Sequence, residues 1–284
     1  MLRSMYAGVS GLRTHQQMMD VTGNNIANVS TTGFKSSATV FQDTLSQTLA
    51  GAAAPTGDGT VPRFGGTNPA QIGLGVRLGG ISTNLAQGSS QLTGRATDIA
   101  VQGDGYFVIQ TGNEALYTRA GSFSLDARGQ LVTPSGGLVL GIAVPGATPP
   151  VAAGPITVPP NGEYESFTIA PDGKVNGVKS DGSGIEMLGQ IKLATFANPA
   201  GLAKVGGSLL RATVNSGPII EGVTAGVPGA DGRGMLAVGV LEMSNVDLAQ
   251  EFTNLIVAQR GFQANSRIIT ASDEVLQDLV NLKR

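Results

Sequence analysis

Few side chains of this chain could carry out chemistry. Cysteine is absent and His15 is the single histidine, so thiolate sites and histidine metal clusters cannot be built. A serine nucleophile needs a histidine and a carboxylate in register, and His15 lies in a run whose spacing predicts a helix. The adjacent carboxylates of Asp273 and Glu274 diverge on a helix and cannot share a site. We therefore predict no catalytic residue, no metal site and no cofactor, and a protein that is not an enzyme.

Two glycine-containing loops resemble ligand-binding loops only superficially. Gly103-Asp104-Gly105 has no third glycine at the spacing of a dinucleotide loop, and a strand-like run follows it where a helix would have to begin. The segment 181–186 (DGSGIE) lacks the alternating oxygen ligands and the distal glutamate of a calcium loop. Both segments are predicted to be turns.

Composition excludes several classes of partner. The 284 residues carry a formal net charge of −2, and only 13% of them are charged, so no basic field attracts nucleic acid or an anionic membrane surface. No window approaches the ~20 apolar residues of a membrane span, and the N-terminus lacks the pattern of a cleaved secretory signal. We expect no nucleic acid partner and no membrane insertion. The length allows two domains.

Both ends of the chain carry apolar residues at helical spacing. Near the C-terminus five apolar residues follow at seven-residue steps, and near the N-terminus the steps alternate between three and four, with only Gln16 and Gly23 breaking the pattern. A sustained repeat of this kind predicts a helix whose apolar face packs on a partner helix. The predicted self-assembly seam consists of Leu2, Met5, Val9, Leu12, Met19, Ile26, Leu248, Leu255, Phe262, Ile269 and Leu276.

The helices are predicted over about 4–28 and 244–282, the second opened by a capping box between Ser244 and Asp247. A core helix that covers a sheet is the commoner source of one amphipathic stripe. Here the companion positions are small or polar over the middle of the second helix, as in a tightly registered helix pair; they are Ala258, Asn265, Ser272 and Leu279. We expect the two ends to pair with each other and then with neighbouring copies, and to be largely disordered before assembly.

The region between the helices has a different texture. Short strand-like runs separated by turns over 97–241 predict a central antiparallel β domain, with a hairpin across Gly103-Asp104-Gly105 and turns between or after strand-like runs at 127–129 and 171–173. Residues 31–96 are predicted to be an extended linker that includes the Gly/Ala/Pro-rich stretch 51–66, and 145–160 a surface loop. The predicted fold is α+β: residues 1–30 pair with 244–284 as a coiled-coil-like stalk, beside the β domain.

Six segments of the chain resemble the shared motifs of bacterial flagellar rod and hook proteins. They are GNNIANV at 23–29, TTGFK at 31–35, GDGYF at 103–107, YTRAGSF at 117–123, EMSNVDL at 242–248 and AQRGFQANS at 258–266. Jointly they span most of the chain and are highly specific. The positions that carry the family signature are Asn24, Asn25, Asn28, Gly33, Phe34, Gly103, Asp104, Gly105, Asn245, Asp247, Gln259 and Arg260.

The resemblance implies a structural subunit of the bacterial flagellum. The C-terminal run 279–284 is most similar to the hook protein in a short form without the outer domain, which would self-assemble into a helical tube that couples rod to filament and transmits torque. The distal rod protein of the basal body is the alternative within the family. Implied partners are copies of the chain itself, the rod, cap and hook–filament junction proteins, and the type III export apparatus. The implied location is the extracellular hook, or the basal body for a rod protein.

A reading from another class also explains part of the sequence. A secreted β-domain adhesin would account for the turn-rich middle but leaves both helical ends without a role. A hydrolase on a β scaffold would need a nucleophile, base or metal cluster that the composition does not supply. An image of concentrated protein would separate these readings, since tubes indicate self-assembly.

Overall fold

The computed structural model describes residues 2–55, 65–142, 154–159, 164–181, 184–217 and 225–282. The chain divides into two compact units. Unit 1 consists of Met1–Ile26, Ser37–Ser82 and Asp247–Arg284, and unit 2 of Ala27–Ser36 and Thr83–Val246. The middle of the predicted linker stretch 51–66 and most of the predicted loop 145–160 lie outside the described residues.

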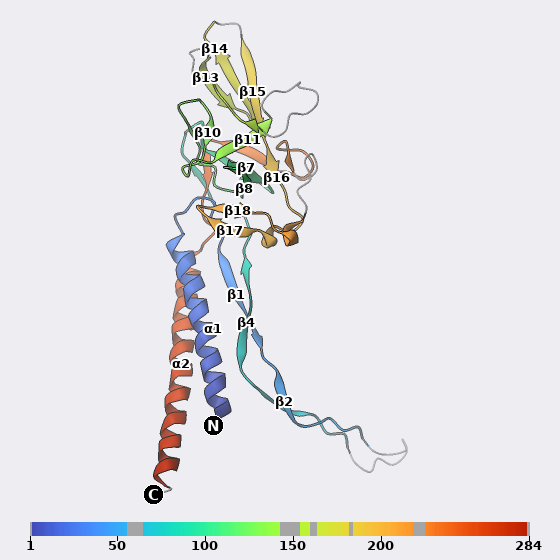
Figure 1. Cartoon of the computed structure of the whole chain (residues 1–284), viewed down its shortest axis with the longest axis vertical. Coiled ribbons are helices and arrows are strands. Elements are labelled where there is room, and N and C mark those ends of the chain that lie inside the picture. Colours follow the sequence, from blue (N-terminus) through green and yellow to red (C-terminus); the bar gives the residue numbers. More distant parts are fainter. Residues whose placement is uncertain are drawn as a thin grey trace. The chain divides into compact units, whose positions relative to one another are not determined.

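Two long helices dominate unit 1. They are α1 (Leu2–Ala27) and α2 (Leu248–Asn281), and they lie side by side in Figure 1, blue and red. The predicted capping box at Ser244 is wrong. Asp247 is the N-cap of α2, and its side chain accepts hydrogen bonds from the backbone N–H groups of Ala249 and Gln250. Asp247 prevails because it stands directly before the first helical residue, where its carboxylate also meets the positive end of the helix dipole.

The remainder of unit 1 is a two-stranded ribbon. Strand β1 (Ser37–Asp43) pairs with β4 (Val76–Thr83), and β2 (Ser46–Ala50) pairs antiparallel with β3 (Ala70–Gly73). Strands therefore occupy much of the range 31–96 in which the sequence predicts an extended linker. Every residue of β2 and β3 is exposed, and an isolated two-stranded ribbon is marginally stable in water. Within the described residues, this part of the ribbon is held by its backbone pairing and by an exposed hydrogen bond from Gln71 Nε2 to Thr48 Oγ1 at 3.3 Å.

Unit 2 is an antiparallel β domain. Among the described residues its main sheet has 13 strands, with the central order β13-β14-β15-β11-β7-β8-β18-β17. The strands of this path are β7 (Tyr106–Thr111), β8 (Glu114–Thr118), β11 (Leu138–Ile142), β13 (Tyr164–Ile169), β14 (Lys174–Lys179), β15 (Ile185–Ile191), β17 (Ala203–Gly206) and β18 (Leu209–Arg211). The attached short strands are β9 (Ser124–Leu125), β10 (Leu131–Val132), β12 (Gly154–Pro155), β16 (Leu193–Ala194) and β19 (Ala225–Gly226). The two 3-10 turns are η1 (Pro199–Gly201) and η2 (Val214–Ser216).

Two further strand pairs join the beginning of unit 2 to its end. Strand β5 (Ser90–Leu92) pairs with β21 (Val240–Glu242), and β6 (Ile99–Gln102) pairs with β20 (Met235–Val238). The predicted hairpin across Gly103-Asp104-Gly105 is therefore wrong, because β6 takes β20 as its partner and β7 takes β8. The predicted turns at 127–129 and 171–173 are confirmed, and each connects an antiparallel pair, β9–β10 and β13–β14.

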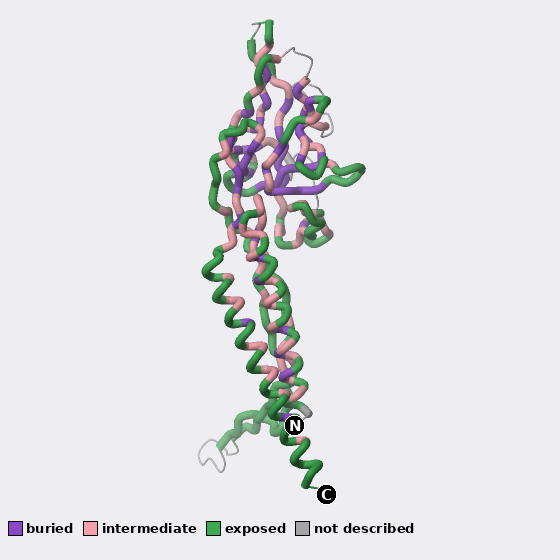
Figure 2. The backbone as a smooth tube through the Cα atoms, turned by 90° about the vertical axis from the view of Figure 1, so that its left-hand side faces the viewer, coloured by how far each residue is buried: buried purple, intermediate pink, exposed green. Residues whose placement is uncertain are grey.

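The hydrophobic core lies in unit 2. Phe107 and Phe123 pack edge to face with ring centroids 5.1 Å apart, and aliphatic residues of the strands surround them. The core includes Ile99, Val101, Ile109, Leu131, Val139, Ile156, Val175, Ile191, Leu193 and Leu236. Figure 2 shows buried positions gathered in the β strands, whereas the helices carry only scattered ones. The α+β fold with two terminal helices and a central antiparallel sheet is thus confirmed.

Candidate functional site: the helix pair and a buried ion network

The two helices of unit 1 pack antiparallel through small residues. A Cβ atom placed on Gly11 would lie 2.7 Å from Asn265 Oδ1, and one placed on Gly261 would lie 2.6 Å from His15 Nε2. The Asn265 side chain is held in place because its Nδ2 donates to the Gly261 carbonyl at 2.9 Å. Each glycine thus provides the notch that a polar side chain of the other helix fills. Larger residues at either glycine would force the helices apart.

The predicted seam of α2 coincides with the face toward α1. Leu255, Phe262, Ile269 and Leu276 are half-buried, and the companions Ala258 and Ser272 between them are buried. Leu248 at the start of the helix is exposed.

On α1 the buried face is adjacent to the predicted stripe: buried residues such as Gly8, Gly11 and Asn25 each stand one position before a predicted residue. Met5, Leu12, Met19 and Ile26 are half-buried and Val9 is exposed, while the side chain of Leu2 lies outside the described residues. The buried residues of α1 are Gly8, Gly11, Thr14, Thr22 and Asn25. Sequence reasoning missed this face because its members are small or polar. The signal was present in the spacing of Gly11 and Asn25, two heptads apart. Contacts of either stripe with neighbouring copies remain a prediction.

Asn25 ties three segments of unit 1 together. Its Nδ2 donates to the Ser37 carbonyl at 2.7 Å and to Glu251 Oε1 at 3.1 Å, and its Oδ1 accepts from the Ser37 backbone N–H at 3.0 Å. The end of α1, the start of β1 and the first turn of α2 therefore meet at one amide. The exposed Asn24 and the α2 residues Gln259 and Arg260 point away from this seam, and Arg260 reaches only Gln263 at 3.4 Å.

Apart from Asp247, the N-cap of α2 in unit 1, the other signature residues belong to unit 2 and shape its backbone. Gly33 adopts a φ of 67°, and a Cβ atom there would lie 2.6 Å from the Ala120 nitrogen. Asn28 Oδ1 accepts from Thr31 Oγ1 at 3.0 Å, which closes the turn before Gly33. The ring of Phe34 lies 5.1 Å from Lys204 Nζ. These contacts fix the segment that follows α1.

Asn245 and the loop at 103–105 make further backbone contacts within unit 2. Asn245 Oδ1 accepts from the Ser36 backbone N–H at 2.8 Å, and its Nδ2 donates to the carbonyls of Asn84 and Ala86. Gly103 and Gly105 both have positive φ, at 102° and 145°. The Asp104 carbonyl accepts from the Gly234 N–H at 2.7 Å. This hydrogen bond connects the turn to the residue directly before β20.

A buried ion network joins four segments of unit 2. Lys35 Nζ lies 2.5 Å from Glu242 Oε1 and donates to the Ala86 carbonyl at 2.8 Å. Glu242 also accepts from the Gly88 N–H at 3.0 Å, and its Oε2 lies 3.6 Å from Arg119 Nη1. Burial lowers the pKa of Lys35, while the hydrogen bond that Lys35 donates to Glu242 acts in the opposite direction and raises it. None of the three side chains is more than 9% exposed, so this is a structural cluster closed to solvent.

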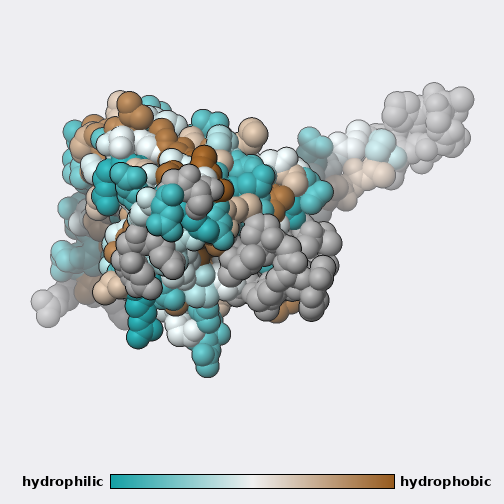
Figure 3. Space-filling view, turned by 90° about the horizontal axis from the view of Figure 1, so that it is seen from above, coloured by the Kyte–Doolittle hydropathy of each residue, from teal (hydrophilic) through white to brown (hydrophobic). Residues whose placement is uncertain are grey.

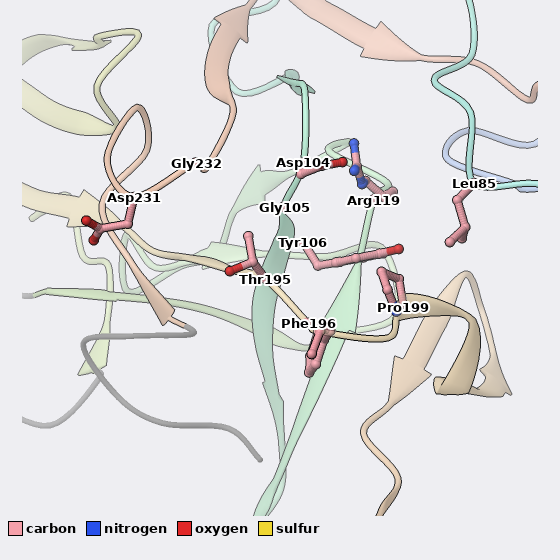
Figure 4. Close-up of a pocket in the computed structure, with 11 residues that line it drawn as sticks. Leu85, Asp104, Gly105, Tyr106, Arg119, Thr195, Phe196, Pro199, Asp231 and Gly232 are labelled. Atoms are coloured by element: carbon pink, nitrogen blue, oxygen red, sulfur yellow. The ribbon is translucent and has the colours of Figure 1, made fainter. Parts of the chain in front are cut away.

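A pocket of about 350 Å³ opens beside this network. Its walls include Asp104, Tyr106, Arg119, Phe196 and Asp231, drawn as sticks in Figure 4. The Arg119 guanidinium stacks 5.0 Å from the centre of the Tyr106 ring and donates to the Gly103 carbonyl at 2.9 Å. The guanidinium is thus engaged by the protein, and no histidine or serine lines the pocket for acyl transfer.

The rest of the described structure offers little else to chemistry. No group of three acidic or histidine side chains within the described ranges is placed to hold a metal ion. No helix among the described residues combines the length and apolarity needed to cross a bilayer. The face in Figure 3 shows small hydrophobic areas interspersed with hydrophilic ones.

Comparison with known proteins gives consistent matches along the chain. Family models match for the flagella basal body rod protein at residues 5–35, the flagellar hook protein FlgE/F/G D1 domain at 100–177, and the flagellar basal body rod FlgEFG protein C-terminal at 237–282. Flagellar basal-body rod protein FlgG of Bacillus subtilis (strain 168) is 50% identical over 284 residues, with all of both chains covered. FlgG of Borreliella burgdorferi is 38% identical over 286 residues, again covering both chains fully. Flagellar hook protein FlgE of Borreliella burgdorferi is 30% identical over an alignment of 451 residues that covers both chains.

Proposed function

Because the chain belongs to the flagellar rod and hook protein family, a set of structural proteins of the bacterial flagellum, we propose that it is a subunit of the basal-body rod. The observation that carries this proposal is the match over all 284 residues, at 50% identity, to a basal-body rod protein of equal extent. The hook relative needs an alignment of 451 residues. The C-terminal run favours the hook protein, but a match that includes every residue outweighs one short motif. The rod alternative is therefore better supported than the hook.

Self-assembly follows from the unpartnered apolar surface of α2. Beyond the face that α1 covers, the helix exposes a second set of large apolar residues, among them Phe252, Ile256, Val257, Val275 and Leu279. Such a surface is typical of an interface rather than of an isolated chain. Copies that use different surfaces on their two partners form an open helical assembly. Residues such as Leu248 and Val9, which are exposed in one copy, would be buried there.

The remaining parts of the function extend this proposal. The chain would polymerise in the axial structure between the inner rod and the hook, and would reach its site through the type III export apparatus. Neighbouring axial proteins would be its partners at either end of the polymer. The adhesin hypothesis gives the two helical ends no role. These ends are the segments that two of the flagellar family models match, so the adhesin hypothesis is not supported.

Site-specific labelling tests the choice between rod and hook. The chain has no cysteine, so a Val214→Cys variant carries one thiol at a fully exposed position. Expressed in place of the native copy, it should bind maleimide–gold on the straight rod of isolated hook–basal bodies. Gold on the curved hook would overturn the rod assignment, and the absence of gold from the whole axial structure would overturn self-assembly. The cysteine-free parent is the matched control.

A further inference from the structure

Unit 1 contains a groove between α1 and β4. One face of α1 provides Tyr6, Val9 and Arg13, and β4 provides Arg77 and Leu78; together they enclose about 470 Å³. We call this site the basic groove. Tyr6 is 72% exposed although it is a large aromatic residue, so the groove presents apolar surface that no described residue covers.

Direct contacts between α1 and β4 hold the two walls of the groove together. Ser10 Oγ accepts a hydrogen bond from the Val76 N–H at 3.2 Å and donates to the Ala7 carbonyl at 2.8 Å. Gly75, with a φ of 127°, lets the strand approach, since a side chain there would overlap Ser10. The strand is therefore held against the folded helix at the floor of the groove.

The charge of the groove is positive and uncompensated. Neither Arg13 nor Arg77 forms an ion pair within the described residues, and Arg77 makes only a long contact of 3.4 Å to Gln42. No carboxylate lines the groove. A complementary ligand therefore combines large apolar side chains with carboxylates beside them.

The end of α2 has this chemistry. The helix has 34 residues and α1 has 26, and Gly8 near the start of α1 already faces Ile269. The last turns of α2 therefore extend beyond the N-terminal end of α1, as Figure 2 shows. Exposed apolar side chains lie on one side of these turns and exposed carboxylates on the adjacent side. We call residues 274–282 the α2 tip; its apolar members are Val275, Leu279 and Leu282 and its acidic members Glu274 and Asp278.

We propose that the basic groove of one copy binds the α2 tip of a second copy. Tyr6 and Leu78 would cover Val275 and Leu279, while Arg13 and Arg77 meet Glu274 and Asp278. A copy cannot fill its own groove, because its α2 tip continues past the end of α1 and away from residues 6–17. The contact is thus head to tail and leaves a free groove and a free tip at the ends of every assembly. This inference rests on the proposed function.

Disulfide trapping between two single-cysteine variants tests the contact. The native chain has no cysteine, so Tyr6→Cys copies and Leu279→Cys copies each carry one thiol. Mixed and oxidised, they should form a crosslinked heterodimer that neither variant forms alone. Val214→Cys in place of Tyr6→Cys is the control, because Val214 is even more exposed than Tyr6 but lies in unit 2. Sedimentation of the same mixtures reports assembly independently of the crosslink.

The outcomes separate this inference from the proposed function. Sedimenting assemblies with the heterodimer support both. Sedimenting assemblies with no more crosslink than the Val214→Cys control overturn the groove–tip contact and leave self-assembly standing. Neither assembly nor heterodimer overturns both.

Charge reversal provides a second test in cells. Arg13→Glu/Arg77→Glu should reduce motility by about tenfold or more, since like charges would then face each other, and so should Glu274→Arg/Asp278→Arg. Combining the four substitutions should restore motility, because the attraction returns with its sign exchanged. Arg128→Glu, at an exposed position of unit 2, should have little effect. Failure of the combined variant to recover, with normal levels of folded protein, would contradict the pairing.

Discussion

Lys35 Nζ and Glu242 Oε1 lie 2.5 Å apart although 207 positions separate the two residues in the chain. Lys35 ends the segment that follows α1, and Glu242 ends β21, a few residues before α2 begins. The pair therefore joins, inside unit 2, the two segments that lead to the helices. Arg119 completes the cluster from the end of β8.

Removing the charge of Glu242 should destabilise unit 2 strongly. Glu242→Gln leaves Lys35 and Arg119 buried without their counter-ion, which costs about 3–5 kcal/mol. Urea unfolding of the purified chain measures the loss. Glu114→Gln, which breaks an exposed pair with Arg211, is the matched control and should cost only ~0–1 kcal/mol. Equal losses for the two variants would show that the cluster contributes no more than a surface pair.

Gly33 should tolerate a side chain far less well than Gly112. Both glycines have a positive φ, 67° and 62°, but only Gly33 is crowded, by the Ala120 backbone. Gly112→Ala should cost about 1–2 kcal/mol for the backbone conformation alone. Gly33→Ala adds overpacking, for a total of about 2–5 kcal/mol. Thermal unfolding compares them, and similar melting temperatures would mean that the contact with Ala120 relaxes at no cost.

The helix seam can be tested by a pair of glycines within α1. Gly11 faces Asn265, whereas nothing lies within 4 Å of a Cβ atom placed on Gly23. Gly11→Ala should weaken the helix pair by about 1–3 kcal/mol and reduce motility, while Gly23→Ala should stabilise α1 by up to about 1 kcal/mol. Adding Asn265→Ala should relieve the crowding at Gly11. If Gly11→Ala is as motile as Gly23→Ala, the close approach at Asn265 is unimportant.

Phe262 tests the role of the apolar stripe on α2. Phe262→Asp places a charge on a half-buried face of the helix, at a cost of several kcal/mol, on the order of 2–7, in each assembled subunit. Assembly and motility should be lost, while thermal unfolding of unit 2 should match that of the parent because residue 262 lies outside this unit. Gln263→Asp changes an exposed neighbour and should assemble normally. Unfolding of unit 2 in the Phe262 variant would place the stripe in the globular core instead.

The sequence predicted the helices well because a long seven-residue repeat is a local signal. The strand pairs β5–β21 and β6–β20 were not predictable in the same way. The turn residues Gly103-Asp104-Gly105 favour a local hairpin, but β6 pairs with the distant strand β20 instead of with β7. The ion network has no local signal either, because Lys35, Arg119 and Glu242 come from separate segments. On α1, the apolar periodicity predicted that the face with Leu12 and Met19 is buried. The structure instead buries the adjacent face, where Gly11 packs against Asn265.

The helix pair should be the least stable part of an isolated chain. The face that α1 buries is formed by small and polar residues, among them Gly8, Thr14 and Thr22, so little apolar area compensates the entropy of ordering the helix. Hydrogen exchange on the dilute monomer should be fast for residues 1–30 and 246–284 and slow within 97–241. Protection of the ends equal to that of the β domain would contradict disorder before assembly.

The pairing of the first strands of unit 2 with its last ones also sets an order in time. A chain that emerges with its N-terminus first carries β5 and β6 long before their partners β21 and β20 are available. Closing so long a loop is slow, so the native β domain cannot be completed on a partly emerged chain. A subunit of this topology that is exported N-terminus first therefore keeps unit 2 incompletely folded during export. Unit 2 can complete its fold only after β20 and β21 have emerged.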